Sequence, residues 1–423
     1  MRTLRRDIRC LCVCVALLLL LNVCSWLALP HISNKEEAAC VLAKQLEPVL
    51  PLPPDLAAVT PIDEVRLFWW YRFEGRRRST RKPERFTCSD GLRCVSDSRT
   101  SAFAAAHGVI IWSGPDHRRG SCLPPQRLDH TWVLEFSEPP TVDPLTESEL
   151  HSEAFAQRFE VKVSHELDSD VVLTALHPLV EGGTIPPAQW RHGVPPRRAI
   201  VWLAAPKSVG GCATPNRRDE LVRRLRSALP PWLPLHAIGK CLHNHDEPLL
   251  QGKQSNGGGN ASTWGSKVRA LSQYTFCLVT ENSAGKDYVT EKLFHAFASG
   301  CLPVYYGSED VADFLPAPNA ALQVLAYPTI AALVSHLTHL AANGTAFAQH
   351  VAWRASPERV RAWWERMQIM TGAAQTPTKP AIFCAICKAV HKARRAGAKR
   401  RRLHASPRSR QPIWPPLLDV QHA

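Results

Sequence analysis

Residues 274–307 read YTFCLVTENSAGKDYVTEKLFHAFASGCLPVYYG, and this stretch decides the fold. A polar segment, TENSAGKDYVTEK, lies between two apolar runs. The first run, YTFCLV, predicts a buried strand; VTEKLFHAFASG predicts a helix that ends at Gly300, and CLPVYYG predicts the next strand. A strand, a helix and a second strand in succession are typical of a parallel sheet covered by helices.

The same alternation extends in both directions from this stretch. Upstream, RAIVWLAAP and PLHAIGKC predict strands, and WGSKVRALSQ and NRRDELVRRLRSAL predict helices, the latter with Asn216 as N-cap. Downstream, PTIAALVSHLTHLAAN and SPERVRAWWERMQ predict two later helices. Closer to the N-terminus, VRLFWW, GVIIW and HTWVLEF predict buried strands. We therefore expect an α/β protein with a parallel sheet and helices on both of its faces.

The 423 residues are enough for two domains with separate cores. The Pro- and Gly-rich stretch GGTIPPAQWRHGVPPR, 182–197, predicts a linker between them. We expect a first domain over 61–190, a second over 191–395 and a basic disordered tail over 396–423. Residues 31–60 are polar and then rich in proline, which predicts a semi-extended stem.

The N-terminus has the features of a membrane anchor. Four arginines within the first ten residues precede an uncharged run, Cys10–Pro30. This run has the roughly 20 residues that a bilayer core requires, and the arginines favour a cytosolic N-terminus. We expect residues 1–30 to form a cytosolic tail and a transmembrane signal-anchor, with the rest of the chain in the lumen. A cleaved signal peptide is the alternative.

The formal net charge of +14 is concentrated at the two ends of the chain. Residues 388–410 contain ten Lys or Arg and no acid, and the first ten residues add three net positive charges. The remainder carries only about +1. The charge therefore does not predict a folded face that binds nucleic acid.

Ten of the 14 cysteines lie outside the N-terminal apolar region. In an oxidising lumen several of them should form disulfides, but the sequence alone leaves the connectivity open. A zinc site built from the pairs Cys88/Cys94 and Cys384/Cys387 is a weaker alternative. Two Asn-x-Ser/Thr glycosylation sequons agree with a lumenal body.

The polar segment between the apolar runs has the composition of a ligand site. In doubly wound sheets ligands bind where strands end and helices begin, and a helix N-terminus presents free N–H groups. Lys292 in the first helical turn opposes the helix dipole, which is favourable only if an anion binds there. Glu291 beside it could accept hydrogen bonds from sugar hydroxyls. The alternative is an ordinary solvated helix start with Thr290 as its cap.

These polar identities resemble the donor-binding signature of the α-1,3-fucosyltransferases, glycosyltransferase family 10. The signature is present as Glu281-Asn282-Ser283, the run Asp287–Lys292, Pro303-Val304 and a closing Gly307. Weaker resemblances in GGCATPNRRDELVRRL, HAIGKC, FEVKVSHELDSDVVL and CAICKAVHK extend the match over roughly 65–392. The sequence is thus identified as a member of this family.

One segment departs from the family pattern. His165-Glu166-Leu167 stands where the family often has Arg-Arg before Asp-Ser-Asp. This departure leaves open what the segment does here. Asp168-Ser169-Asp170 itself is a D-x-D string, which binds Mn²⁺ in another glycosyltransferase fold. Because Arg and Lys already supply positive charge, we expect a structural or donor-side role for it and no required metal cofactor, with Mn²⁺ at most a non-essential stimulant.

The resemblance implies two Rossmann-like domains facing a cleft, the GT-B type of fold. It also implies GDP-β-L-fucose as the donor and an α-linked product, and therefore inversion at the anomeric carbon by a single in-line displacement. Such a displacement requires a base on the acceptor hydroxyl and cationic groups at the leaving diphosphate. The transition state should resemble an oxocarbenium ion.

The resemblance assigns donor binding to Arg218, Asn282, Tyr288, Glu291 and Lys292. Arg218 and Lys292 are the candidates for the diphosphate, with Arg217 as the alternative to Arg218. Glu291 is assigned to ribose or fucose hydroxyls. The catalytic base is assigned to Glu138, in a Glu-Pro-Pro turn after the strand HTWVLEF, with Glu135 as the alternative.

The acceptor is inferred from smaller likenesses. The segment EDVADFLPAPNAAL and the Cys-x-x-Cys ending resemble plant-type members that fucosylate the core GlcNAc of glycoprotein N-glycans. Antennal lactosamine and protein O-fucosylation are the alternatives, as are a related transferase with another nucleotide-sugar donor and a lumenal binding protein without turnover. The expected location is the Golgi membrane, as a single-pass type II protein, with the endoplasmic reticulum as the alternative.

Overall fold

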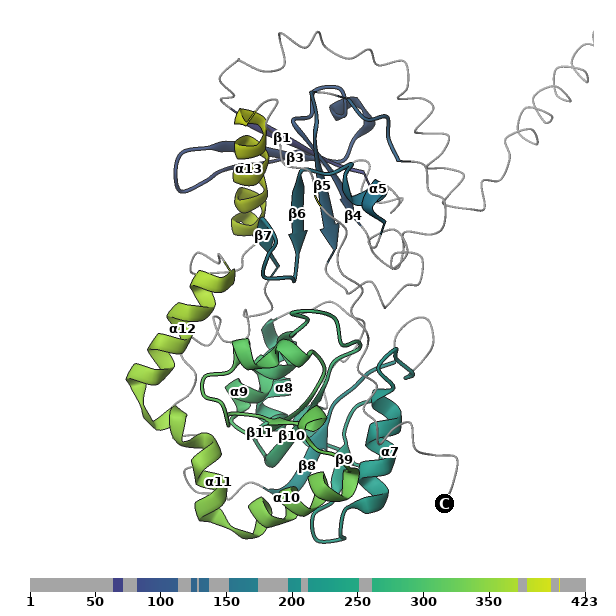
Figure 1. The fold of residues 1–423 in the computed structure, drawn as a ribbon, viewed down its shortest axis with the longest axis vertical. Coiled ribbons are helices and arrows are strands. Elements are labelled where there is room, and N and C mark those ends of the chain that lie inside the picture. Colours follow the sequence, from purple (N-terminus) through teal and green to yellow (C-terminus); the bar gives the residue numbers. More distant parts are fainter. Residues whose placement is uncertain are drawn as a thin grey trace, which may run out of the picture. The chain divides into compact units, whose positions relative to one another are not determined.

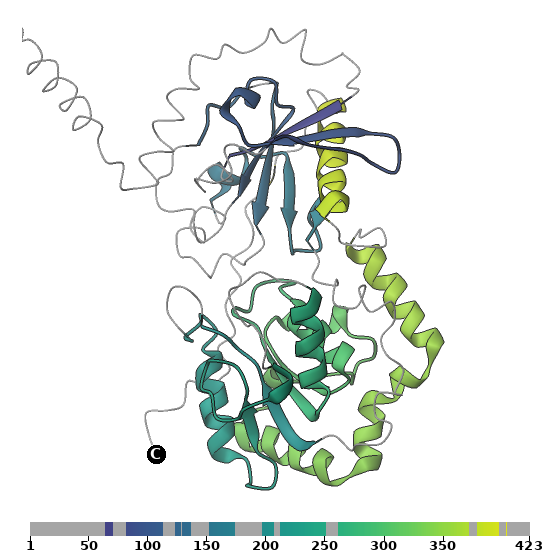
Figure 2. The ribbon, with the colours of Figure 1, turned by 180° about the vertical axis from the view of Figure 1, so that it is seen from behind.

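The computed structural model describes residues 64–70, 82–112, 123–127, 129–136, 152–173, 197–206, 212–250, 261–371, 379–396 and 403. Within these ranges the chain forms two β-sheets, coloured purple to blue and teal to green in Figure 1 and seen from behind in Figure 2. Both sheets belong to one compact unit, Pro51–His117 with Gln126–Ala423. The other unit, Met1–Leu50 with Arg118–Pro125, lies almost wholly outside the described ranges.

The predicted anchor and stem, 1–60, the predicted linker up to residue 196 and nearly all of the basic tail also lie outside the described ranges. None of the helices that the structure does describe is long and apolar enough to cross a bilayer.

The first sheet has the strand order β2-β3-β1-β4-β5-β6-β7. Neighbouring strands are parallel, except that β2 runs antiparallel to β3. The apolar runs predicted from VRLFWW, GVIIW and HTWVLEF form its interior strands, as expected for parallel strands that are covered on both faces. The bounds are β1 (Glu64–Trp69), β2 (Glu84–Thr87), β3 (Arg93–Asp97), β4 (Gly108–Trp112), β5 (Thr131–Phe136), β6 (Val161–Ser164) and β7 (Val171–Val172).

Helix α13 (Lys379–Arg395) completes the core of the first sheet (Figure 1). Its buried Phe383 and Ile386 pack in one cluster with Leu67 and Val133 of the strands. From the sequence, these residues were predicted to belong to the second domain, because they follow it in the chain. The structure corrects that assignment: the apolar face of α13 is buried on the first sheet, to which the chain returns at its end.

The second sheet is entirely parallel and has the strand order β12-β11-β10-β8-β9. Its strands are β8 (Arg197–Trp202), β9 (Leu235–Ala237), β10 (Tyr274–Thr280), β11 (Leu302–Tyr306) and β12 (Leu322–Gln323). The chain adds β9 on one side of β8 and then places β10 on the other side. This reversal defines a topological switch point between β8 and β10.

Helices cover both faces of the second sheet. Because side chains alternate along a strand, Trp202 packs on one face with Leu225 and Leu337, whereas Val201 packs on the other face with Phe297. The longer helices are α7 (Arg218–Ala228), α8 (Ala261–Leu271), α9 (Glu291–Ser299), α10 (Ile330–Ala342), α11 (Gly344–Val351) and α12 (Pro357–Thr371). Shorter ones are η2 (Thr100–Ala102), α5 (Glu153–Ala156), η5 (Pro248–Leu250), η6 (Glu309–Phe314), η7 (Val324–Ala326) and η8 (Ala352–Ala355).

The cysteines that the structure describes form four disulfides: Cys88–Cys384, Cys94–Cys387, Cys212–Cys241 and Cys277–Cys301. The first two fasten α13 to the β2–β3 region of the first sheet. The four cysteines of the alternative zinc site, Cys88, Cys94, Cys384 and Cys387, therefore form two disulfides.

The α/β class with parallel sheets is confirmed. The expected end of the helix at Gly300 is confirmed as well, since α9 stops at Ser299 and Gly300 adopts a left-handed conformation with φ 79°. The arrangement of two domains facing a cleft stays a prediction.

Candidate active site

The switch point brings two loops to the same edge of the second sheet. β8 and β10 are parallel neighbours, so the segments that follow them leave the sheet at the same end. Ligands of open α/β sheets bind at this place. Asn216 and Arg218 come from the segment after β8, and Asn282 belongs to the β10–α9 loop (Glu281–Thr290).

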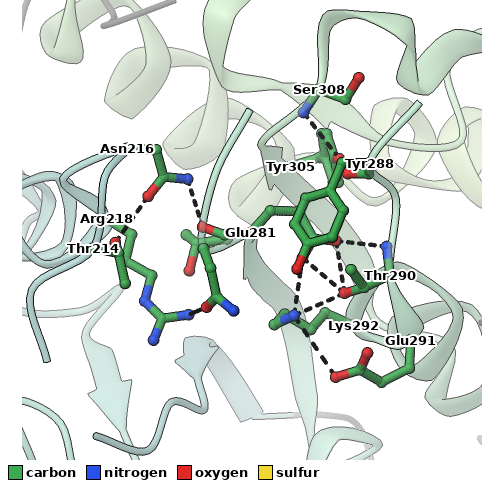
Figure 3. A network of polar contacts seen from close by, with 12 residues as sticks. Thr214, Asn216, Arg218, Glu281, Tyr288, Thr290, Glu291, Lys292, Tyr305 and Ser308 are labelled. Carbon is green, nitrogen blue, oxygen red and sulfur yellow. Dashed lines mark hydrogen bonds and ion pairs between the residues drawn. The ribbon is translucent and has the colours of Figure 1, made fainter. Parts of the chain in front are cut away.

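Glu281 lies at the centre of a hydrogen-bonded network (Figure 3). Its carboxylate is completely buried, and it accepts hydrogen bonds from the Thr290 backbone N–H at 2.8 Å and from the Lys292 ammonium at 2.9 Å. The Thr290 hydroxyl donates to Glu281 and accepts from Lys292 at 2.7 Å, instead of capping α9. A buried carboxylate therefore fixes the cation at the start of the helix.

Lys292 can still bind a ligand. Its side chain is 25% exposed, and its hydrogen bonds to described residues, Glu281 and Thr290, use two of the three ammonium N–H groups. Glu291 Oε1 lies 3.7 Å from the ammonium, too far for a hydrogen bond. Burial acts to lower the pKa of Lys292, but the carboxylates of Glu281 and Glu291 raise it above its ordinary value. The ammonium therefore stays charged at neutral pH.

The pKa of Glu291 shifts in the opposite direction to that of Lys292. Burial acts to raise the pKa of its carboxyl group, but the neighbouring Lys292 ammonium lowers it below its ordinary value. Glu291 is thus an ionised acceptor at the rim of the network, about one third exposed at 35%. It could accept hydrogen bonds from hydroxyl groups of a ligand.

Arg218 lies on the other side of Glu281 from Lys292 (Figure 3). It is the first residue of α7, it is 3% exposed, and its Nη1 donates to Asn282 Oδ1 at 2.5 Å. The alternative, Arg217, is exposed and has the left-handed φ of 54°. Of the two arginines, Arg218 is therefore the one that the structure brings to the β10–α9 loop.

The prediction that Asn216 caps a helix is wrong. The N-cap of α7 is Arg217, and no side chain caps it. The buried Asn216 amide donates instead to the Glu281 carbonyl at 2.5 Å and accepts from the Thr214 hydroxyl at 2.9 Å. Asn216 thus ties the segment after β8 to the β10–α9 loop, a contact between residues 65 positions apart that local sequence cannot reveal.

The closing Gly307 of the sequence pattern has a steric reason. A Cβ atom at this position would lie 2.6 Å from the Tyr305 hydroxyl and 2.7 Å from Glu281 Cγ. The Tyr305 hydroxyl accepts a hydrogen bond from the Ser308 N–H at 3.2 Å. Burial raises the pKa of Tyr305 well above its ordinary value, so the hydroxyl stays protonated. Gly307 therefore provides the space in which Glu281 is held.

The D-x-D string is engaged within the β6–β7 turn (His165–Asp170). Asp170 accepts from the Lys162 backbone N–H at 2.9 Å, and the Lys162 ammonium pairs with Asp168. Burial acts to raise the pKa of Asp168, but Lys162 and Lys286 lower it below its ordinary value. In the described part of the chain, no three or more His, Cys, Asp or Glu side chains are grouped so as to hold a metal ion.

The predicted base follows strand β5 of the first sheet in the sequence. Glu138 follows β5 but falls outside the described ranges. Glu135, the alternative, lies within β5 and is partly buried. Which of the two serves as base stays a prediction.

A family model described as glycosyltransferase family 10 (fucosyltransferase), C-terminal part, matches residues 199–405. These residues include the whole edge described above. Over these residues, just under half of the chain, the sequence matches glycosyltransferase family 10.

Proteins with similar sequences are named for different activities. GDP-fucose protein O-fucosyltransferase 3 of Gallus gallus is 24% identical over 337 residues, which are 77% of this chain and 66% of that protein. Alpha-(1,3)-fucosyltransferase B of Drosophila melanogaster is 26% identical over 306 residues, 69% of this chain and 63% of that protein. The chain therefore spans a little less than two thirds of the length of these relatives.

A crystal structure of an alpha1,3-fucosyltransferase with GDP-fucose is also similar, at 15% identity and a TM-score of 0.45, over 77% of this chain and 98% of that one. This TM-score is too low to transfer any detail of the site.

The structure brings Arg218, Asn282, Glu291 and Lys292 to one edge of the second sheet. Tyr288 belongs to the same loop; its buried ring lies edge-on to His165, 5.1 Å between centroids. Glu281 belongs to the sequence signature, but its role is apparent only from the structure. A carboxylate directly after an apolar strand, with a lysine at the next helix start, was the signal that could have found it.

Proposed function

We propose that this family 10 protein is an inverting glycosyltransferase that moves L-fucose from GDP-β-L-fucose to a hydroxyl group of a glycoprotein. The observation that carries the proposal is the placement of Arg218 and Lys292 on two sides of Glu281 at the switch point of the second sheet. Two cations at a site that already favours phosphate groups suit a nucleoside diphosphate.

Charge compensation explains why the site needs its carboxylates. The Lys292 ammonium is paired with Glu281 and lies 3.7 Å from Glu291, so two carboxylates hold this cation in place, while Arg218 is held by Asn282. A diphosphate would add acceptors for both cations. As the sugar–phosphate bond breaks, negative charge grows on the diphosphate, and these preorganised donors stabilise the transition state more than the bound donor.

The acceptor hydroxyl must attack from the side opposite the leaving GDP, since the α-linked product requires inversion. A carboxylate base would remove its proton as the new bond forms, and general-base assistance contributes about 10²–10⁴ in rate. We assign this role to Glu138. We expect no metal requirement, because Asp168 and Asp170 are engaged by Lys162.

For the acceptor we retain the GlcNAc of the N-glycan core, in α-1,3 linkage. Protein O-fucosylation is the second candidate, favoured by the likeness to the Gallus gallus relative named for that activity. Antennal lactosamine is the third. By the composition of residues 1–30 we also propose anchorage in the Golgi membrane as a type II protein.

The test uses the full chain in membranes from cells that express it. It is incubated with GDP-fucose and, separately, with other nucleotide sugars, in the presence of core N-glycan, lactosamine and folded protein acceptors. We expect a mass gain of one deoxyhexose with GDP-fucose on one acceptor class, unchanged by a chelator. Transfer from another nucleotide sugar would contradict the donor, and GDP binding without any transfer would favour a binding protein.

A further inference from the structure

Three consecutive residues of the β10–α9 loop each meet a residue of the β6–β7 turn. The Lys286 ammonium pairs with Asp168 Oδ2 at 3.1 Å. The Leu167 backbone N–H donates to Asp287 Oδ2 at 2.9 Å. The pattern continues at the next residue, where the rings of His165 and Tyr288 meet edge to face. The β6–β7 turn belongs to the first sheet, whereas the loop carries Asn282 and leads directly to Glu291 and Lys292.

The turn is built as a rigid element. The hydroxyl groups of Ser164 and Ser169 lie 2.6 Å apart, and the Ser164 hydroxyl also accepts from the Glu166 N–H at 3.1 Å. Lys162 joins Glu166 to Asp168 across the turn. These contacts use most of the polar groups of the turn internally, but Asp168 Oδ2 and the Leu167 N–H are directed to the β10–α9 loop.

The loop needs such support at Asp287. This residue has the left-handed φ of 54°, a conformation that residues other than glycine adopt at a cost and that Asn and Asp tolerate best. Its backbone N–H donates to Asp310 at 3.2 Å, and its buried carboxylate accepts from Leu167. The carboxylate thus holds the loop in a conformation that the backbone alone does not favour.

We propose that the β6–β7 turn positions the donor-binding loop. Asp287 is the positioning residue of the loop, because its carboxylate accepts the hydrogen bond from Leu167 of the turn. The proposal rests on the function proposed above and deepens it, because it makes donor affinity depend on a turn of the first sheet. It also gives a role to the segment His165-Glu166-Leu167, where this chain departs from the Arg-Arg pattern: Leu167 supplies a backbone donor and His165 an aromatic edge. Asp168 contributes the weaker, exposed part of the contact.

The first experiment compares Asp287→Gly with Asp287→Asn in the full chain. Glycine tolerates the left-handed φ but removes the acceptor for Leu167, whereas asparagine tolerates it and keeps an acceptor oxygen. We expect Asp287→Gly to raise the GDP dissociation constant and the KM for GDP-fucose about tenfold, with kcat and the acceptor KM changed much less. Asp287→Asn should stay within about threefold of the unmodified protein.

The matched control is Asp313→Ala, which removes an exposed acid from η6, away from these contacts. It should leave GDP affinity unchanged. Equal GDP affinity in Asp287→Gly and the unmodified protein would overturn the proposal, as would Asp287→Asn being as weak as Asp287→Gly. If the unmodified protein binds no GDP, the proposed function fails instead, so the two failures are distinguishable.

A second experiment keeps the proposal testable if Asp287→Gly does not fold. Asp168→Ala, Lys286→Ala and the double variant form a cycle around the ion pair. We expect each single variant to weaken GDP binding two- to fivefold and the double variant to be no weaker than either. Additive effects, or no effect in any variant, would contradict a positioning role for the turn.

Discussion

The edge of the second sheet after β10 and the segment that follows β5 of the first sheet are assigned different chemical tasks. After β10, a buried carboxylate, two cations and a helix start are fixed by short hydrogen bonds within one loop and its neighbours. β5 ends at Phe136, and the base that we assign, Glu138, follows two positions later in the sequence. The two tasks differ in what they need, because binding a diphosphate requires a preorganised set of charges, whereas deprotonating an acceptor requires a single carboxylate at the right place.

The largest expected effect separates the two edges by function. Glu138→Gln should lower kcat about 10³-fold and leave GDP affinity unchanged, because it removes the base and none of the donor contacts. Glu135→Gln is the matched control within the same strand and turn, and should retain most of the activity. Both are measured by fucose transfer and by GDP titration. If Glu135→Gln is the inactive variant, the base assignment moves to Glu135.

The next effect tests the other edge. Lys292→Ala and Arg218→Ala should each lower kcat/KM about 10²–10³-fold and weaken GDP binding, since each removes a donor aimed at the diphosphate. Arg217→Ala is the control, because Arg217 is exposed while its neighbour Arg218 is buried. Unchanged GDP affinity in both Lys292→Ala and Arg218→Ala would refute the proposed donor site.

The smallest expected effect is a pH dependence of stability, to which buried histidines of both sheets contribute. Burial lowers the pKa of His107, His130 and His165 of the first sheet, and of His236 of the second, to about 4. Unfolding returns each to about 6.5. Between pH of about 4 and 6.5 the unfolded chain binds more protons than the folded protein. The free energy of unfolding should therefore fall as the pH is lowered through this range, and these histidines should not affect it at higher pH.

Thermal unfolding at pH 7, 6 and 5 measures this dependence before most carboxylates titrate. His130→Phe, whose ring can keep the edge contact that His130 makes with Phe103, should flatten the fall in melting temperature. A variant with the same pH slope as the unmodified protein would show that His130 does not contribute to it.

The strands and most helices of the second sheet were predictable because hydrophobic period and turn residues agree there. Apolar runs such as YTFCLV predict a buried strand, and Gly300 marks the end of the helix. The place of α13 was not predictable, because an amphipathic helix does not indicate which sheet its apolar face covers. The pairing of Cys88 with Cys384 depends on the same long-range contact.

Within the site, sequence reasoning found the residues that carry charge and missed those that hold them. Arg218 and Lys292 stood out as cations in a polar turn. Asn216 looked like a helix cap because its real partner, the Glu281 carbonyl, is far away in the sequence. Asp287 was part of the signature but received no role, since a left-handed backbone conformation and a contact with Leu167 appear only in three dimensions.

The two disulfides between α13 and the β2–β3 region join parts of the chain that are nearly 300 residues apart, with separations of 296 and 293. The whole second sheet lies within the loop that they close. A protease that cuts once anywhere inside this loop would therefore produce two pieces that still migrate together on a non-reducing gel. Only a reductant would separate them, so a single band on a non-reducing gel would not prove an uncut backbone.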